Sequence, residues 1–270
     1  MRLPVPRALR GNGGLRLAPN PPYELMIIAM TAFHLTDIRA GEVTLIAPGG
    51  IRAPIQKMIP DFERKTGHTV KATFSSGNGT KQRVMNGEMF DVPIVQPPLA
   101  EVLATGHVVA ASETPLATVA VAVAVRKGAA KPDISTPEAV KKMLLAAKSV
   151  SIPDGARGAA AGVSFDETLK KLGIVEKMKP TLRRVQGGAN AMAVLARGEV
   201  EIGLTFLSEI HDPGVEVVGI LPREISTPTA LVGYVSAHAK APEAAKALLM
   251  YLSSPEAAGV YKSLGMVPGR

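Results

Sequence analysis

The sequence predicts an α/β protein with parallel strands, and three observations support this. From Gly41 onward, short apolar runs typical of buried strands alternate with amphipathic segments of helical period. Loops of a few Gly, Ser and Pro residues join them, as in β-α-β units. The length of 270 residues is enough for two domains of ordinary size.

The first half contains three apolar runs that we expect to be neighbouring strands, at 43–47, 69–74 and 92–95. The segment after the first run has apolar residues at spacings of three and four from Ile51 to Phe62, which indicates a helix. Pro54 fits the first turn of that helix, whereas Pro60 is expected to kink or divide it. A short helix at 81–85 and another at 99–103 complete this half.

The second half repeats the pattern with strands at 119–125, 150–152, 182–185, 202–206, 215–220 and 230–236. Helices are expected after Ser135, at 163–172 and 191–196, and after Pro242 and Pro255. The loop pattern breaks near Thr114-Pro115, and a strand returns after Pro228. We therefore expect residues 42–118 plus 225–270 to form lobe 1 and residues 119–224 to form lobe 2.

Residues 1–41 are expected to be a disordered leader or a signal-like segment. Leu25–Leu35 is apolar but too short to span a bilayer, so no stable membrane span is predicted. It fits the apolar region of a signal peptide with a long basic leader, which would make the protein periplasmic. The alternative is an over-long gene start, with translation beginning at Met26 or Met30 and a cytoplasmic product.

Composition excludes several classes of function. The absence of Cys excludes disulfides, thiolate catalysis and Cys-ligated metal, and five scattered His give no metal cluster. No Walker, dinucleotide or Gly-x-Ser-x-Gly pattern occurs, so no cofactor is expected. The net charge is +8, and residues 1–41 hold five Arg against one Glu and one Asp. The rest has no long basic run, which argues against nucleic acid and suits a small anionic ligand.

Four loops share one arrangement, at 48–52, 75–80, 154–162 and 187–190: each follows a strand and opens a helix. The first N–H groups of a helix have no partner within the helix, and the helix dipole places positive charge there, so an anion satisfies both. In an open parallel sheet such loops lie at the carboxyl ends of the strands. Two loops belong to each half, so they can face each other across a cleft.

Beyond these loops, Val43–Arg270 resembles the type II periplasmic solute-binding proteins and is most similar to their molybdate-binding branch. The resemblance rests on Phe74-Ser75-Ser76-Gly77, Asn86-Gly87 with Asp91-Val92, Ala161-Gly162 with Leu172-Gly173, Arg197-Gly198-Glu199 with Ile202-Gly203, and the run Tyr251–Ala258. It implies two α/β lobes, each a mostly parallel sheet flanked by helices, with an oxyanion in the cleft. It also implies a monomer, without metal or cofactor, that hands its ligand to an ABC permease.

The loops and the resemblance together give a set of candidate ligand-binding residues. They are Gly49, Gly50, Arg52, Ser75, Ser76, Gly77, Asn78, Gln96, Arg157, Ala160, Ala161, Gly162, Gly187, Gly188, Asn190 and Phe206. The family's first-loop Ser corresponds to Gly50, and its Tyr corresponds to Phe206. Losing such partners of a desolvated anion costs about 1–3 kcal/mol each, so tight molybdate binding is not expected.

Two Arg residues point to a different ligand within the same class. Arg binds carboxylates through two parallel hydrogen bonds, so Arg52 and Arg157 suit a small organic polycarboxylate. The alternative is that both are solvated or paired with Asp154 or Glu209. We therefore expect a solute-binding protein that captures a small oxyanion or organic acid.

A second hypothesis comes from aconitate-isomerase-like proteins, which resemble the same branch and are expected to isomerise unsaturated tricarboxylates. Such an enzyme needs a base to move a proton across an allylic system and donors to stabilise the negative charge that develops. The candidate bases are Glu209 and Asp154, with His211 less suitable. The alternative for Glu209 is an acid that caps a helix.

Overall fold

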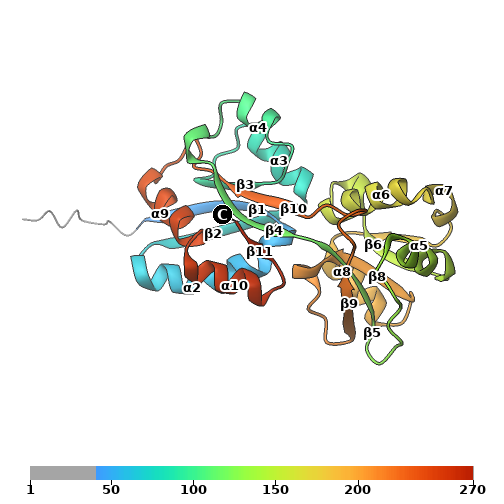
Figure 1. Cartoon of the computed structure of the whole chain (residues 1–270). Coiled ribbons are helices and arrows are strands. Elements are labelled where there is room, and N and C mark those ends of the chain that lie inside the picture. Colours follow the sequence, from blue (N-terminus) through green and yellow to red (C-terminus); the bar gives the residue numbers. More distant parts are fainter. Residues whose placement is uncertain (1–40, 270) are drawn as a thin grey trace, which may run out of the picture. The chain divides into compact units, whose positions relative to one another are not determined.

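Two β-sheets organise the chain in the computed structural model, which describes residues 41–269 (Figure 1). Each sheet is flanked by helices, and together they make the two-lobed α/β fold that the sequence predicted. The predicted leader of residues 1–41 lies outside the described residues, apart from Gly41. Across 41–269, no helix has the length and apolar character needed to span a bilayer.

The first sheet has six strands in the order β11-β4-β10-β3-β1-β2. Its strands are β1 (Glu42–Pro48), β2 (Thr69–Ser75), β3 (Val92–Val95), β4 (Thr114–Val119), β10 (Thr229–Gly233) and β11 (Val267–Pro268). β1 is parallel to β2 and β3, as predicted, whereas β10, β4 and β11 join by antiparallel pairs. The helices of this part are α2 (Arg52–Thr66), α3 (Gly77–Met85), α4 (Ala100–Ala104), α9 (Pro242–Leu252) and α10 (Pro255–Ser263).

The second sheet has five strands in the order β7-β6-β8-β5-β9. Its strands are β5 (Val121–Arg126), β6 (Val150–Pro153), β7 (Leu182–Val185), β8 (Ile202–Phe206) and β9 (Val215–Ile220). β6 is parallel to β7 and β8, and β5 is antiparallel to β8 and β9. Its helices are α5 (Pro137–Ala146), α6 (Ala160–Leu172), α7 (Val175–Met178) and α8 (Gly188–Ala196). Both sheets are therefore mixed, with a parallel part that carries the loops of interest.

The chain passes between the sheets twice. The segment predicted as one strand over 119–125 is two strands, because β4 ends at Val119 in the first sheet and β5 begins at Val121 in the second. The return runs from the end of β9 to the start of β10. The lobe boundaries predicted near residues 119 and 225 stay a proposal.

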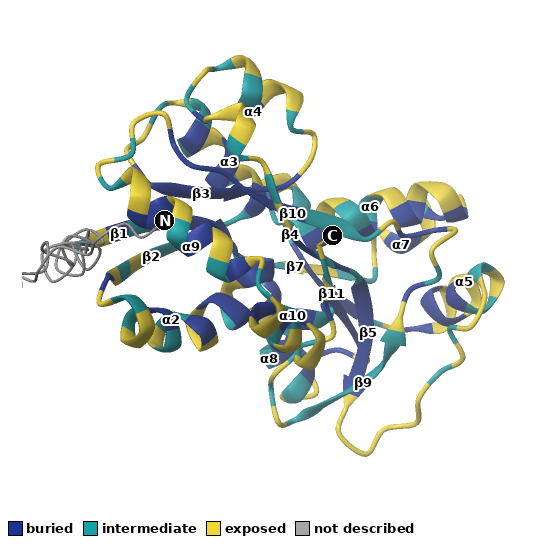
Figure 2. Cartoon of the chain, turned by 60° about the vertical axis from the view of Figure 1, so that its left-hand side comes forward, coloured by how far each residue is buried: buried dark blue, intermediate teal, exposed yellow. Residues whose placement is uncertain are grey.

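The helices bury one face against the sheets and expose the other, which Figure 2 shows as dark blue and yellow stripes. Residues from most strands and from the inner helix faces form one large apolar cluster. α2 continues undivided through Pro60, contrary to a divided helix, and buries Met58 and Phe62 on either side of it. The ring of Tyr251 from α9 lies 5.5 Å from that of Phe62, and its hydroxyl donates to Asp61 at 2.7 Å.

Candidate functional site

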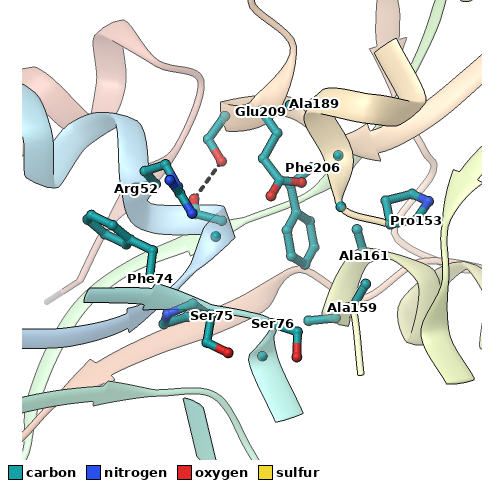
Figure 3. Close-up of a pocket in the computed structure, with 18 of the residues that line it drawn as sticks. Arg52, Phe74, Ser75, Ser76, Pro153, Ala159, Ala161, Ala189, Phe206 and Glu209 are labelled. Atoms are coloured by element: carbon teal, nitrogen blue, oxygen red, sulfur yellow. Dashed lines mark hydrogen bonds between the residues drawn. The ribbon is translucent and has the colours of Figure 1, made fainter. Parts of the chain in front are cut away.

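A pocket of about 700 Å³ lies where the loops after β1, β2, β6 and β7 meet (Figure 3). Both sheets contribute to it, because the ends of β3 and β8 supply Gln96 and Phe206. Every strand named here delivers its carboxyl end to this one place, as expected for the parallel part of an α/β sheet. The volume is within the usual range for small-molecule sites.

The N-termini of four helices of nine or more residues line this pocket. They belong to α2, α3, α6 and α8, which begin at Arg52, Gly77, Ala160 and Gly188. In the described chain only α3 of these four has a side-chain cap, from Ser76, whose hydroxyl accepts from Gly79 N at 3.1 Å. The starts of α6 and α8 leave first-turn N–H groups without a side-chain cap, where they can donate to an anion. The start of α2 differs, because it continues from a short helical turn at Gly49–Ile51 and Arg52 N already donates to Gly49 O.

Two helices outside the pocket have their N-termini capped by polar side chains. Thr136 and Ser254 cap α5 and α10 by accepting hydrogen bonds from Ala139 N and Ala257 N. The carboxylate of Asp91 accepts hydrogen bonds from the backbone N–H groups of Lys240 and Ala241, the two residues that precede α9. A side-chain cap is also missing at α4, α7 and α9, so the pocket is distinguished by the convergence of the uncapped N-termini of α2, α6 and α8 on one place, which suits an anionic ligand.

Most residues predicted for the site lie in this pocket. Those that line it are Gly49, Gly50, Arg52, Ser75, Ser76, Gly77, Gln96, Arg157, Ala160, Ala161, Gly187, Gly188, Asn190 and Phe206. Two predicted residues lie elsewhere, Asn78 in an adjacent pocket and Gly162 in a packed turn. A Cβ on Gly162 would lie 2.2 Å from the carbonyl oxygen of Pro153, so this Gly is required for close packing of α6 on the end of β6.

Arg52 is the cation best placed to bind a ligand. It is the first residue of α2, and its guanidinium carbon lies 4.7 Å above the centre of the Phe74 ring, which holds it at the pocket edge (Figure 3). Within residues 41–269 it makes no ion pair with a carboxylate. Its hydrogen-bond donors therefore remain available to an anion.

Arg157 and Asp154 are engaged with each other and with their own turn. The Arg157 side chain is 76% exposed, and its Nε lies 3.6 Å from Asp154 Oδ2. The Asp154 carboxylate also accepts a hydrogen bond from Ala156 N at 3.0 Å and caps the short helical turn there. The alternative reading of this pair, solvated and mutually paired, fits its surroundings better than a binding or catalytic role.

Glu209 is the carboxyl group at the centre of the pocket. Thr205 Oγ1 donates to Glu209 Oε2 at 2.5 Å. A Cβ on Gly188 would lie 2.3 Å from the same oxygen, so Gly188 leaves the room that the carboxyl group occupies. Burial raises the pKa of Glu209, although the Thr205 hydrogen bond and the positive charge of Arg52 act in the opposite direction. Glu209 therefore favours the protonated form more than an ordinary Glu does.

Phe206 and Gly50 are a packed pair, and this explains why both lack the hydroxyl of the molybdate-binding pattern. A Cβ on Gly50 would lie 2.9 Å from Phe206 Cδ2, so the ring covers the place where a Ser side chain would start. Ser208, which sequence analysis did not select, fixes this arrangement by donating from Oγ to Gly50 O at 2.6 Å, the dashed line in Figure 3. Its only signal in the sequence is its position two residues after Phe206.

The remaining polar groups of the pocket are held locally. Asn190 Nδ2 donates to Gln186 O at 2.7 Å, and His211 Nε2 lies 2.7 Å from Ser208 O. Over residues 41–269, the structure brings together no group of three or more His, Cys, Asp or Glu side chains able to hold a metal. The pocket thus offers backbone N–H groups, the guanidinium of Arg52 and the carboxyl group of Glu209. Its wall also carries the hydroxyl and amide groups of Ser75, Ser76 and Gln96, and the Asp154 carboxylate that caps its own turn.

Comparison with known proteins places this chain in a class. Residues 43–267 match the family model of the bacterial extracellular solute-binding proteins, and the chain belongs to this family. Among curated relatives, an aconitate isomerase from a Pseudomonas species is 34% identical over 233 residues, which is 84% of this chain and 87% of that protein. The molybdate-binding protein ModA of Azotobacter vinelandii is 29% identical over 247 residues, 89% of this chain and 96% of the relative.

A solved structure supports the same fold. The periplasmic molybdate-binding protein of Azotobacter vinelandii superimposes with a TM-score of 0.71 at 18% identity, and covers 84% of this chain and 100% of its own. These findings confirm the predicted family and fold.

Proposed function

We propose that this solute-binding protein captures a small organic polycarboxylate in the pocket around Arg52. The observation that carries this proposal is a fixed guanidinium, without a carboxylate partner in residues 41–269, beside three uncapped helix starts. A carboxylate bound at the helix starts would satisfy their N–H groups. A second carboxylate of the same molecule would bind the fork of Arg52.

A tetrahedral metal oxyanion fits this pocket less well. The side chains at positions 50 and 206 carry no hydroxyl, and the Phe206 ring packs against Gly50. A molybdate ion within the cage of helix starts would therefore have fewer donors, each missing one costing about 1–3 kcal/mol. It would also be too compact to engage Arg52 at the pocket edge.

We further propose that the protein acts in the periplasm and delivers its ligand to an ABC permease. The support is its family of extracellular solute-binding proteins and the periplasmic location stated for the superimposed molybdate-binding protein. Sequencing the N-terminus of the protein from its native host tests this, with a mature start near Gly41 expected. An uncleaved form confined to the cytoplasm would contradict it.

Calorimetric titration of citrate, trans-aconitate and molybdate tests the ligand class. We expect a polycarboxylate to bind more tightly than molybdate, and Arg52→Ala to remove about 1.5–3 kcal/mol of its binding free energy. Arg157→Ala is the matched control, because this exposed Arg also lines the pocket and its loss should change binding little. Submicromolar molybdate binding without carboxylate binding would reject the proposal.

A second candidate function is isomerisation of an unsaturated polycarboxylate. The observation that favours it is the position of the Glu209 carboxyl group inside the pocket. This half-buried carboxyl group, with a raised pKa, suits a base that removes a proton from the methylene carbon beside the double bond. The protonated Glu209 then returns the proton to the far carbon of the three-carbon unit as the double bond moves. The 34% identical aconitate isomerase supports this candidate.

Proton NMR of trans-aconitate incubated with the protein distinguishes binding from catalysis. Conversion to the cis isomer by the wild type, lost in Glu209→Gln while calorimetric binding persists, would establish the isomerase. Binding without conversion in the wild type would leave a solute-binding role alone.

A further inference from the structure

A second pocket, of about 510 Å³, lies next to the first and is not used by the function proposed above. It shares three lining residues with the first pocket, Gly77, Gln96 and Ala160. The rest of its wall comes from α3, the loop after β3, the start of α6 and the segment 227–230 that leads into β10. We call it the Lys81 pocket after its most unusual residue.

Lys81 lies in this wall as a buried cation. Its side chain belongs to a residue that is only 9% exposed, and Nζ donates one hydrogen bond, to Pro98 O at 2.9 Å. An ammonium group has three donors, and across residues 41–269 neither a second acceptor nor a carboxylate within ion-pair distance is present. A buried charge without a counterion is costly, so this position calls for an anion.

Gln96 supplies a second, independent observation. The residue is 5% exposed and lines the Lys81 pocket, and its Nε2 finds no hydrogen-bond partner in the described part of the chain. Gly77 leaves the room that this amide occupies, because a Cβ at that position would lie 2.3 Å from Gln96 Oε1. A buried amide donor without an acceptor costs about as much as a lost hydrogen bond, and an anion would supply the acceptor.

The acidic residues near this pocket do not neutralise Lys81. Glu167 lines the pocket and Glu101 acts on Lys81 through its charge, but both residues are exposed. Burial lowers the pKa of the Lys81 amine, and the charge of Glu101 only partly opposes this. The nearby side chains of Ser164 and Thr227 are neutral and add further donors at the rim.

We propose that the Lys81 pocket is a separate binding site for a small carboxylate anion, held by the Lys81 ammonium group and the Gln96 amide. The site adjoins the ligand pocket around Arg52 and shares Gln96 with its wall, whereas Lys81 lines the Lys81 pocket and not the ligand pocket. It bridges both lobes, because Asn78 N donates to Gly158 O at 3.1 Å across its wall. A bound anion would therefore hold α3 and the start of α6 together.

Titration of acetate into the ¹⁵N-labelled full chain at constant ionic strength, followed by NMR, tests the site. The backbone amides of Asn78, Gly158 and Ser164 line only the Lys81 pocket, whereas those of Gly49 and Gln56 line only the Arg52 pocket. We expect saturable shifts of the first group in the wild type and in Arg52→Ala. Lys81→Met should weaken this binding by about tenfold or more, as for a lost charged hydrogen bond.

Lys141→Met is the matched control, because Lys141 is an exposed residue of α5 that lines neither pocket, and it should leave the shifts unchanged. Lys81→Arg keeps the charge and should retain binding, so a folding defect of Lys81→Met does not decide the outcome. Shifts that vanish in Arg52→Ala but persist in Lys81→Met would overturn the proposal and assign acetate to the ligand pocket. Absence of shifts in the first group would also overturn it. Acetate binding to the Lys81 pocket is measured without the polycarboxylate. A negative result would therefore reject the Lys81 site and leave the proposed polycarboxylate binding at Arg52 untouched.

Discussion

The sharpest prediction concerns Glu209 and the pH dependence of ligand affinity. Burial raises the pKa of Glu209 above its ordinary value of 4.5, and a carboxylate ligand in the same pocket would raise it further. As pH rises, Glu209 therefore loses its proton at a lower pH in the free protein than in the complex. Affinity must fall as pH rises from the pKa of the free protein to that of the complex, by at most tenfold per pH unit.

The size of this effect follows from the charges in the pocket. Two unit charges about 5 Å apart repel by about 3 kcal/mol at an effective dielectric constant of about 20. A repulsion of this size corresponds to about a hundredfold in an equilibrium constant, so this is the largest loss of affinity expected for the wild type across its pH window. Glu209→Gln replaces the carboxyl group by a neutral amide of the same shape and removes the proton that is linked to binding.

The assay is calorimetric titration of citrate between pH 5 and pH 9 with the wild type and Glu209→Gln. The quantity compared is the Kd of the wild type divided by the Kd of Glu209→Gln, because the titration of citrate itself affects both proteins equally. We expect this quotient to rise with pH, since only the wild type loses affinity through ionisation of Glu209. Glu138→Gln, an exposed acid of α5, is the control and should follow the wild type. A ratio that stays constant from pH 5 to pH 9 would refute the reasoning.

Three further predictions follow from close contacts and buried charge. Phe206→Tyr adds a hydroxyl at the pocket wall and should strengthen molybdate binding, measured by calorimetry, by about 1 kcal/mol, whereas weaker binding would contradict the role given to this position. Gly162→Ala places a methyl group 2.2 Å from Pro153 O and should lower the free energy of unfolding by about 1–3 kcal/mol in urea titration, so an unchanged midpoint would count against the packing argument. The folded-state pKa of Lys81 is lowered, so the charged amine costs stability below that pKa and stability is regained as pH rises toward 10.5. Lys81→Met should accordingly raise the thermal midpoint of the anion-free protein at pH 7, and a lowered midpoint would show that the hydrogen bond to Pro98 outweighs the burial cost.

The loops of the site were predictable from the sequence because they depend on local signals. A strand that ends in Gly or Ser and runs into a helix leaves bare N–H groups, and the starts of α3 and α8 lie in the pocket as that pattern indicated. Arg52 was recognisable because it lies two residues after Pro48-Gly49-Gly50, where a helix was expected to begin. Parallel strands have their carboxyl ends at the same edge of a sheet, so the loops that follow them were expected to lie together.

Features that depend on contacts between distant residues were not predictable in this way. The shared geometry of Phe206 and Gly50 joins positions that are far apart in the chain, and no local pattern reveals that the ring replaces a Ser side chain. The buried state of Lys81 was equally hidden, because a Lys in a short polar helix reads as solvated. The prediction of a single strand at 119–125 was wrong for a related reason. An uninterrupted apolar run does not show that Val119 and Val121 pair in different sheets.

The hydrogen bond from Ser208 to Gly50 has a consequence for how much of the protein is ready to bind. It joins the segment that follows β8 of the second sheet to the loop that follows β1 of the first sheet, so it holds two walls of the pocket in the arrangement described here. Any contact that stabilises this arrangement without ligand raises the fraction of molecules already competent to bind, and the apparent Kd falls in proportion to that fraction. By this reasoning, Ser208 contributes to ligand affinity through the position that it gives to Gly50.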